Sequence, residues 1–229
     1  MTLAEIHTRL DLDMDEAGAP WFNAVEKDDY VNKASIDLVE EWYQRYGSDE
    51  FVSQALAPLT ERQAITFNAQ VGVYATLNLD TVVVPQAPDG SYFMHPLKCL
   101  VDSTDNCGRK GIYPSARVEI NDLENLTTDP FKWPSTKKPK HYVVDDGVNS
   151  QRLLYVYVDH LNSTNPPAIT GGNVHTLYYL RSPRKVSTSG AVGPELPSLA
   201  HDKLCEKAVL LMLENVEAKR RRSHELVNY

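Results

Sequence analysis

The sequence predicts an α+β fold: a helical bundle, formed by an N-terminal hairpin and a C-terminal helix, with a large antiparallel β-rich insertion between them. Apolar residues recur at three- and four-residue spacing in residues 2–46 and again in 199–222, as in amphipathic helices. From about residue 71 to 186 the spacing becomes alternating, as in strands. The simplest arrangement packs the first and last helices together. It gives a helical part over 1–60, a β-rich insertion over 61–190, and a C-terminal helix with a basic tail over 191–229.

Residues 21–46 contain the clearest helix. Asn23 can cap it, and Glu26 stands three residues later, where it completes a capping box. The broad apolar and aromatic stripe, which includes Val31 and Trp42, must be buried, so this helix is interpreted as a scaffold and docking element. The opposite face is predicted to be exposed and carries Asp28, Asp29, Lys33, Asp37, Glu41 and Arg45. A similar capping box at Thr2 begins a helix over residues 2–14, and the two helices form a hairpin.

The middle of the chain is predicted to be mostly extended. Strands are expected at 81–84, 91–94, 97–103, 111–119, 142–144, 153–158 and 174–180, with 97–103 and 111–119 paired across a turn at 105–108. Residues 59–68 fit either a strand or a linker, and 121–126 a helical turn. The proline- and lysine-rich residues 129–141 are expected to form an exposed loop. Both faces of 153–158 are apolar or aromatic, so this strand should be covered on both sides, by helices of its own chain or by a neighbouring subunit.

Residues 187–197 have the composition of a linker. The closing helix is expected over 199–222, and residues 223–229 form a tail without a pattern.

Composition limits the function classes. The chain has 229 residues, 42% of them hydrophobic, and a formal net charge of −8. This acidic net charge argues against a nucleic-acid binder that relies on bulk electrostatics, because phosphate contacts need a basic surface. No apolar run approaches the roughly 20 residues that cross a bilayer, and the N-terminal residues lack the apolar core of a signal peptide. Three cysteines cannot make a disulfide framework, so we expect folding in a reducing cytoplasm.

Catalytic and metal-binding motifs are weak. His95, Cys99, Cys107, His141 and His160 lie in the same region, but their spacing fits no common zinc pattern, and Cys99 is interpreted as a core residue on a strand. Asp145 and Asp146 precede Gly147 in a sequence typical of turns. A hydrolase would use Asp145, Asp159 and His160. The sequence therefore predicts no cofactor, no metal and no enzymatic activity, with this hydrolase as the least favoured alternative.

Two basic groups are the candidate interface residues. Lys137, Lys138 and Lys140 form one, and Lys219, Arg220, Arg221 and Arg222 form the other. Each could contact nucleic acid or an acidic patch on a partner protein, or could simply be solvated. The second group lies at the C-terminal end of the closing helix, where it could dock on a partner protein.

Three stretches together carry a family resemblance: APWFNAVEKDDYVNKASIDLVEEWYQRY, then INDLENLTTDPFKWPSTKKPKHYV with the later TLYYLRSPRKV, and finally ELPSLAHDKLCEKAVLLMLENVEAKR. In that order they resemble virion structural proteins of the short-tailed crAss-like bacteriophages. The resemblance covers nearly the whole chain and rests on the order and spacing of all three stretches. The matching positions are structural: Trp21, Phe22, Tyr30, Tyr43, Pro130, Phe131, Pro134, Leu196, Pro197 and Glu214.

The resemblance implies a head-to-tail connector, or ring protein, of the phage neck or tail. Such a subunit forms a homo-oligomeric ring below the portal protein, here expected to be twelvefold. Its partners are the portal and neighbouring ring proteins, and DNA passes through its channel only as cargo during genome ejection. It has no membrane partner and no enzymatic activity, and it resides in the virion after assembly in the host cytoplasm.

The alternative from another class is an adaptor or assembly factor that does not stay in the particle. It would be missing from purified virions, whereas a ring subunit would be present.

Overall fold

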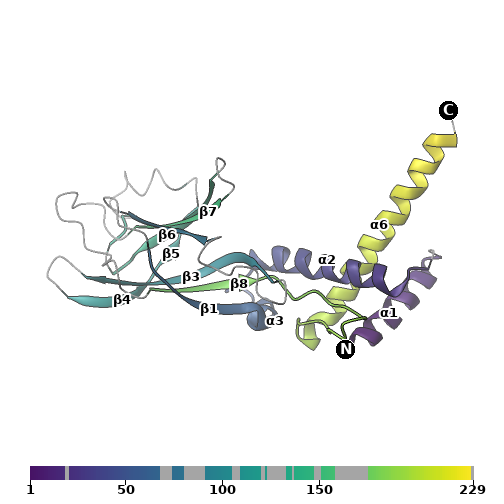
Figure 1. Ribbon diagram of the computed structural model, residues 1–229, viewed down its shortest axis with the longest axis horizontal. Coiled ribbons are helices and arrows are strands. Elements are labelled where there is room, and N and C mark those ends of the chain that lie inside the picture. Colours follow the sequence, from purple (N-terminus) through teal and green to yellow (C-terminus); the bar gives the residue numbers. More distant parts are fainter. Residues whose placement is uncertain are drawn as a thin grey trace. The chain divides into compact units, whose positions relative to one another are not determined.

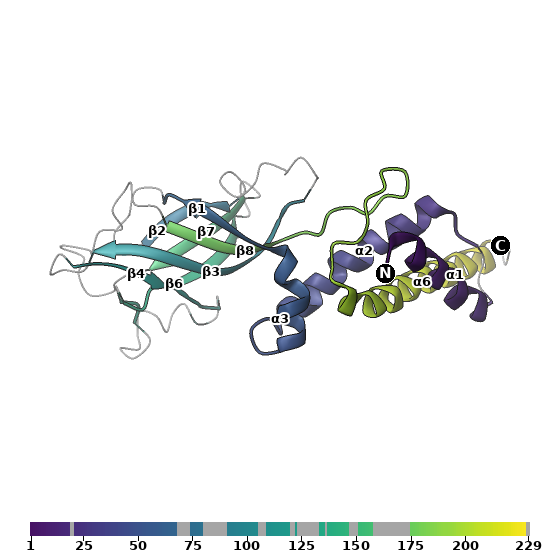
Figure 2. The ribbon, with the colours of Figure 1, turned by 90° about the horizontal axis from the view of Figure 1, so that it is seen from below.

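The computed structural model describes residues 1–18, 21–67, 74–79, 91–104, 109–119, 122, 133–135, 137–146, 151–157 and 175–227 (Figures 1 and 2). The chain divides into two compact units. Unit 1 comprises Met1–Leu59, Pro88–Ser91 and Ser182–Tyr229, and unit 2 comprises Thr60–Ala87 and Tyr92–Arg181. N-terminal helices, a strand-rich middle and a C-terminal helix follow one another along the chain, so the α+β prediction is confirmed.

Unit 1 begins with two capped helices. α1 spans Leu3–Glu16 and α2 spans Ala24–Tyr43, and both predicted capping boxes are present. The Thr2 amide donates to Glu5 Oε2 at 2.7 Å, and the Glu26 amide donates to Asn23 Oδ1 at 2.9 Å. Each box satisfies two amides that have no partner within the helix. The short helices α3 (Glu50–Leu56), η1 (Ala57–Leu59) and η3 (Ser198–Ala200) complete the unit together with α6 (His201–Val227).

The core of unit 1 forms where α6 packs on α1 and α2. The three helices contribute apolar residues at helical spacing: Ile6, Leu10 and Met14 from α1, Val31, Ala34, Leu38 and Trp42 from α2, and Leu204, Ala208, Met212 and Val216 from α6. The small side chains of Ala34 and Ala208 allow close approach of the helices that carry them. The predicted apolar stripes of α1, α2 and α6 are therefore the buried ones.

A strap over residues 186–188 is held on α2. Asn32 makes two hydrogen bonds with the backbone of Val186: its Oδ1 accepts from the amide at 2.7 Å, and its Nδ2 donates to the carbonyl at 3.2 Å. One helical turn earlier, Asp28 accepts from the Thr188 amide at 2.8 Å and from the Thr188 hydroxyl at 3.0 Å. These contacts correct two predictions. Asp28 is buried instead of exposed, and this part of the expected linker is a fixed segment.

Among its described residues, unit 2 contains two four-stranded sheets. The first has the order β1 (Thr60–Ile65), β8 (His175–Arg181), β3 (Phe93–Thr104) and β4 (Lys110–Pro114), and the second has β2 (Tyr74–Asn78), β7 (Gln151–Tyr157), β6 (Lys140–Asp146) and β5 (Ala116–Arg117). Leu100 faces Pro114 and Thr104 faces Lys110, so the predicted pairing of 97–103 with the following strand is confirmed. Residues 60–65 form a strand, which resolves the ambiguity of 59–68.

The segment 111–119 differs from its prediction as one strand. Its first part, β4, belongs to the first sheet, and its second part, β5, belongs to the other sheet and runs parallel to β6. Ser115 stands between them, and its amide donates to the Cys99 carbonyl at 2.8 Å. The chain therefore changes sheets at Ser115, and the expected all-antiparallel region contains one parallel pair.

The buried cluster of unit 2 draws on both sheets. It includes Ile65, Val101, Leu177 and Tyr179 from the first sheet and Ala75, Leu77, Leu154 and Val156 from the second. The alternate residues of β7, Leu153, Tyr155 and Tyr157, are half-buried. Tyr155 stacks on Tyr142 with ring centroids 4.9 Å apart and an interplanar angle of 6°. The expectation that both faces of this strand are covered thus holds fully for one face and partly for the other.

Several predicted segments lie outside the described residues. They are 81–84, the turn at 105–108, and all of 121–126 except Asp122.

The strap gives a first testable prediction. Replacing Asp28 with alanine removes the acceptor of the part-buried hydrogen bonds from the Thr188 amide and hydroxyl, and we expect the free energy of unfolding of unit 1 to fall by roughly 2–3 kcal/mol. Urea titration followed by the fluorescence of buried Trp42 measures this. Asp29→Ala, at the exposed neighbouring position, is the matched control and should cost less than about 0.5 kcal/mol. Equal unfolding midpoints for the two variants would show that the strap does not stabilise the unit.

Candidate interaction surfaces

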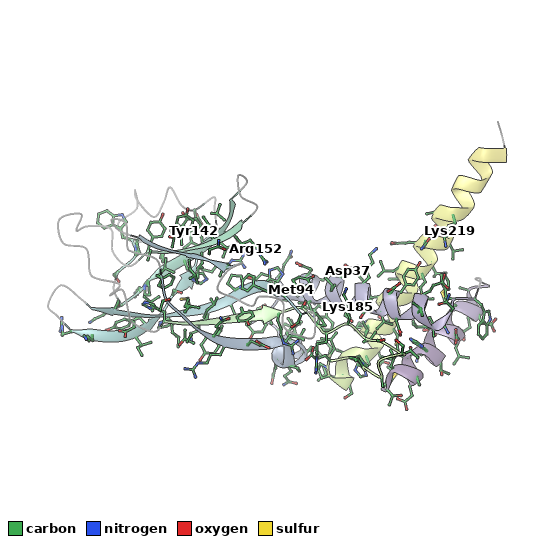
Figure 3. All side chains as sticks on the ribbon, viewed as in Figure 1. Asp37, Met94, Tyr142, Arg152, Lys185 and Lys219 are labelled. Atoms are coloured by element: carbon green, nitrogen blue, oxygen red, sulfur yellow. The ribbon has the colours of Figure 1, made fainter. Side chains whose placement is uncertain are left out.

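The C-terminal turns of α6 continue past the packed helices of unit 1. Val216 is buried, whereas Glu217, Ala218 and Lys219 are exposed. Figures 1 and 3 show the helix leaving the layer of α1 and α2 near the labelled Lys219. Arg220, Arg221 and Arg222 lie on the same helix, but their side chains are outside the described part of the structure.

The basic run at the end of the chain lies inside a helix. The sequence predicted a tail from residue 223, but α6 extends to Val227, so this prediction is wrong. The run is more than one turn from the helix end. The favourable effect of the helix dipole on basic residues, which is limited to the last turn, therefore does not account for it.

The other basic group divides between a turn and a strand. Lys137 and Lys138 are exposed, and their turn is closed by hydrogen bonds between the backbones of Ser135 and Lys138 at 2.9 and 3.2 Å. Lys140 instead begins β6, faces Tyr157 on β7 and is half-buried. Two lysines are thus presented as predicted, and the third belongs to the sheet. The expected exposed loop over 129–141 is wrong at its end, because His141 is buried.

Two of the metal-ligand candidates converge on Ser115. The Ser115 hydroxyl donates to the Cys99 carbonyl at 2.9 Å and lies 2.8 Å from His141 Nδ1. Because the hydroxyl proton is used toward Cys99, the network assigns the imidazole proton to Nδ1. His141 Nε2 is buried and has no hydrogen-bond partner among the described residues. Sequence reasoning missed Ser115, which no motif marks.

Burial sets the protonation of this cluster. It lowers the pKa of His141 to about 4, with a further decrease from the nearby Arg117 guanidinium, and it raises the pKa of the Cys99 thiol to about 12. Both groups are therefore neutral near pH 7. Cys99 is a buried residue on β3, as predicted. Within the described ranges, no three His, Cys, Asp or Glu residues are placed to hold a metal ion, and Cys107 and His160 fall outside those ranges.

The residues of the hydrolase alternative are only partly described. Asp145 lies on β6 opposite Arg152, and Asp146 is the last residue of that strand. Their prediction as part of a turn is therefore wrong. Asp159 and His160 lie outside the described residues, so that trio stays a prediction.

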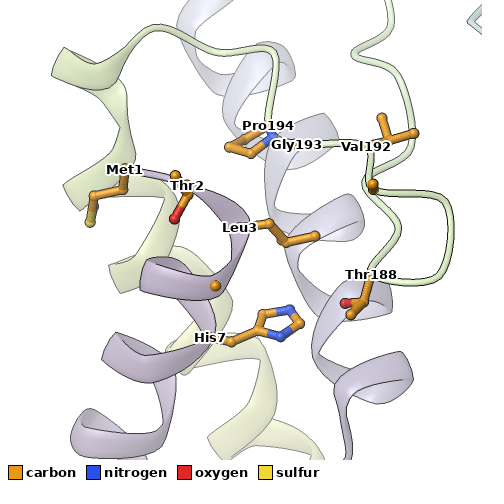
Figure 4. A pocket seen from close by; sticks show the side chains of 10 residues that line it. Met1, Thr2, Leu3, His7, Thr188, Val192, Gly193 and Pro194 are labelled. Atoms are coloured by element: carbon orange, nitrogen blue, oxygen red, sulfur yellow. The ribbon is translucent and has the colours of Figure 1, made fainter.

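An apolar pocket of about 670 Å³ lies in unit 1 between the start of α1 and residues 188–194 (Figure 4). Leu3, Val192 and Pro194 line it, and His7 faces it. His7 Nε2 is 3.0 Å from Asp28 Oδ1, but the angle is not that of a hydrogen bond. The pocket therefore combines an apolar wall with the imidazole of His7, which lies beside the Asp28 carboxylate that holds the strap.

Comparisons with known proteins assign no family. No protein-family model matches the chain, and no curated protein matches it either. Among the described helices, none is both long and apolar enough to span a membrane.

The buried histidine gives a prediction about pH. The imidazole pKa is about 4 in the folded chain and near 6.5 in the unfolded chain, so the unfolded state takes up a proton first as the pH falls. We expect the free energy of unfolding of unit 2 to drop by roughly 2 kcal/mol between pH 7 and pH 5. Urea titrations at the two pH values measure this.

His141→Asn is the control, because asparagine keeps a donor near the Nδ1 position and does not titrate. A smaller pH dependence should remain in this variant, because burial also lowers the pKa of His175. If the wild type and His141→Asn lose equal stability on acidification, His141 does not control the response.

Proposed function

We propose that the chain is a structural virion protein: a ring-forming head-to-tail connector subunit in the neck of a tailed bacteriophage, bound below the portal and lining the channel for genome and cargo ejection. The observation that carries the proposal is the ordered resemblance of the three stretches beginning at Ala19, Ile120 and Glu195. The first of these stretches contains α2 and the third contains most of α6, the two longest helices described.

The architecture supports this role in two ways. The exposed end of α6 extends beyond the core of its unit and brings a basic run to an otherwise acidic chain, which is a suitable docking element for an acidic partner. The half-buried tyrosine face of β7 in unit 2 is amphipathic aromatic surface of the kind that interfaces use. Both features fit a subunit that contacts several neighbours.

The central experiment is the mass and the negative-stain image of the purified protein, alone and with a candidate portal protein. A closed ring supports the proposal, and its symmetry gives the copy number. A monomer that becomes a ring only on the portal means that docking organises the subunits. A monomer under both conditions contradicts the proposal and favours an assembly factor that would be absent from purified virions.

A truncation tests the docking role of the end of α6. Removing residues 219–229 should leave the helical unit folded, because the deletion begins after Val216, the last buried residue described in α6. Binding to the portal or to the next ring should weaken, as measured by incorporation of the truncated chain into particles.

A full-length variant that replaces Lys219, Arg220, Arg221 and Arg222 with glutamine separates charge from helix length. If charge is what docks, this variant fails as the truncation does. Normal incorporation of both variants would exclude this helix end as the docking element.

A further inference from the structure

β4 is the last strand of its sheet, and among the described residues no strand lies on its other side (Figure 1). Its middle residue, Ile112, is apolar and β-branched, and 65% of its side chain is exposed. An exposed apolar edge strand is a template on which a further strand can pair. Whether it can do so depends on where its backbone N–H and C=O groups point.

Two hydrogen bonds of β3 fix the direction of the β4 backbone. Ser115, just after β4, donates its amide to the Cys99 carbonyl at 2.8 Å, so the backbone groups of Cys99 point toward β4. The Asp102 amide instead donates to the imidazole of His175 on β8 at 3.0 Å, so the backbone groups of Asp102 point away from β4. Ile112 lies opposite Asp102, in a pair that exchanges no backbone hydrogen bond. The N–H and C=O of Ile112 therefore point to the free edge.

The direction of the β8 backbone follows from the same alternation. Leu100 lies two residues before Asp102 and points the same way, toward β8, where it faces Thr176. Thr176 therefore points back toward β3. The next residue, Leu177, points to the other side of β8, toward β1, where its partner is Gln63.

β1 is the opposite edge of the same sheet. Because Gln63 points toward β8, its two neighbours, Arg62 and Ala64, present their N–H and C=O groups to the free edge. Both of these side chains are exposed. The sheet thus ends on each side in a strand whose outward backbone groups are open to solvent.

The side chains at the two edges lie on the same face of the sheet. Val101 is buried in the core and faces Tyr113, so the neighbouring Ile112 has its side chain on the opposite, outer face. Leu177 is also buried, and Arg62 lies one residue from the partner of Leu177, which places Arg62 on that outer face as well. The pleats of the two edges therefore match.

The sheet can continue from one copy of the chain into the next. Its four strands are each antiparallel to their neighbours, so a strand that is added antiparallel to β4 runs in the direction of β1. The lengths also agree, since β4 has five residues and β1 has six. We propose that β4 of one copy pairs with β1 of the next copy, with Ile112 opposite Arg62 and Lys110 opposite Ala64.

This inference rests on the proposed ring function and specifies the contact between its subunits. Two β4 strands related by a twofold axis would also pair, but β1 would stay unpaired in each copy and the assembly would stop at two. The contact between β4 and β1 joins two different surfaces, so it repeats from copy to copy, as ring closure requires. A closed ring leaves neither edge of this sheet unpaired.

Proline substitutions in the full chain test the backbone contact. Ile112→Pro and Ala64→Pro each remove an N–H that points to a free edge, so the pairing with β3 or β8 is kept, and proline is tolerated at such positions. Ile112→Ala is the matched control, because it keeps the N–H and removes only side-chain atoms. Circular dichroism should show all three variants folded.

Light scattering and sedimentation over a range of concentrations measure self-association. We expect each proline variant to weaken it by roughly 30-fold or more, because proline removes a donor and its ring collides with the added strand. Ile112→Ala should weaken it by less than about fivefold. Equal weakening by Ile112→Pro and Ile112→Ala would overturn the backbone pairing.

A mixture of the two proline variants tests which edges meet. Ile112→Pro retains an intact β1 edge and Ala64→Pro retains an intact β4 edge, so an equimolar mixture should form 1:1 dimers that cannot grow further. Neither variant alone should form them. If Ala64→Pro alone associates as the wild type does while Ile112→Pro does not, β4 meets β4 and the proposed contact is wrong.

Hydrogen exchange of the assembled wild-type chain gives a readout that needs no variant. The Tyr113 amide points toward β3 and is protected with or without a partner, whereas the Ile112 amide is protected only when another strand covers it. We expect the Ile112 and Ala64 amides to exchange at least about tenfold more slowly than unprotected amides, as measured by residue-resolved mass spectrometry. Exchange at the unprotected rate in the assembled state would overturn the contact.

The outcomes separate this inference from the ring function. If both proline variants assemble into the same rings as the wild type, alone or on the portal, the contact is wrong and the ring function stands. If the wild type forms open chains that both proline variants abolish, the contact is right and the ring function fails. A wild-type chain that is monomeric alone and on the portal contradicts both.

Discussion

The hydrogen bonds from Asn32 and Asp28 to the strap at 186–188 are the constraint on which unit 1 depends. They join parts of the chain that are 154 and 160 residues apart in sequence. Because the two side chains lie one helical turn apart, they hold successive parts of the strap against α2. The strap in turn leads into η3 and α6, which buries Leu204 and Ala208 against the helices that precede it. These hydrogen bonds therefore help to return α6 to α2.

The helices could be predicted from the sequence because their signals are local. The capping boxes at Thr2 and Asn23 and the stripes at three- and four-residue spacing require only neighbouring residues. Asp28 could not be predicted in the same way. A carboxylate on an amphipathic helix is ordinarily solvated, and its burial follows from Thr188, a distant partner that no local pattern indicates.

The strands show a similar division. The alternating residue pattern of the sequence located β3 and β4, but it could not place β4 and β5 in different sheets. The change of sheet at Ser115 depends on hydrogen bonds to Cys99 and His141, which no local pattern indicates. The candidate surfaces were predicted from charge, which located Lys137 and Lys138 but also included Lys140, a strand residue. In the sequence, Trp21 is marked only as one of the aromatic positions of the family resemblance. Its exposure is a tertiary property that no local pattern indicates.

Along the sequence, unit 1 is made of segments that come before and after most of unit 2, and this order has a consequence for biosynthesis. The ribosome delivers α1, α2 and α3 first, and α6 begins at His201, after every strand has been made. At translation speeds of about 5–20 residues per second, the interval between α3 and α6 is roughly 10–30 s. Throughout it the apolar stripes of α1 and α2 lack their partner helix and present a site for chaperones or for aggregation. The part of the protein that is made first is therefore the last to finish folding.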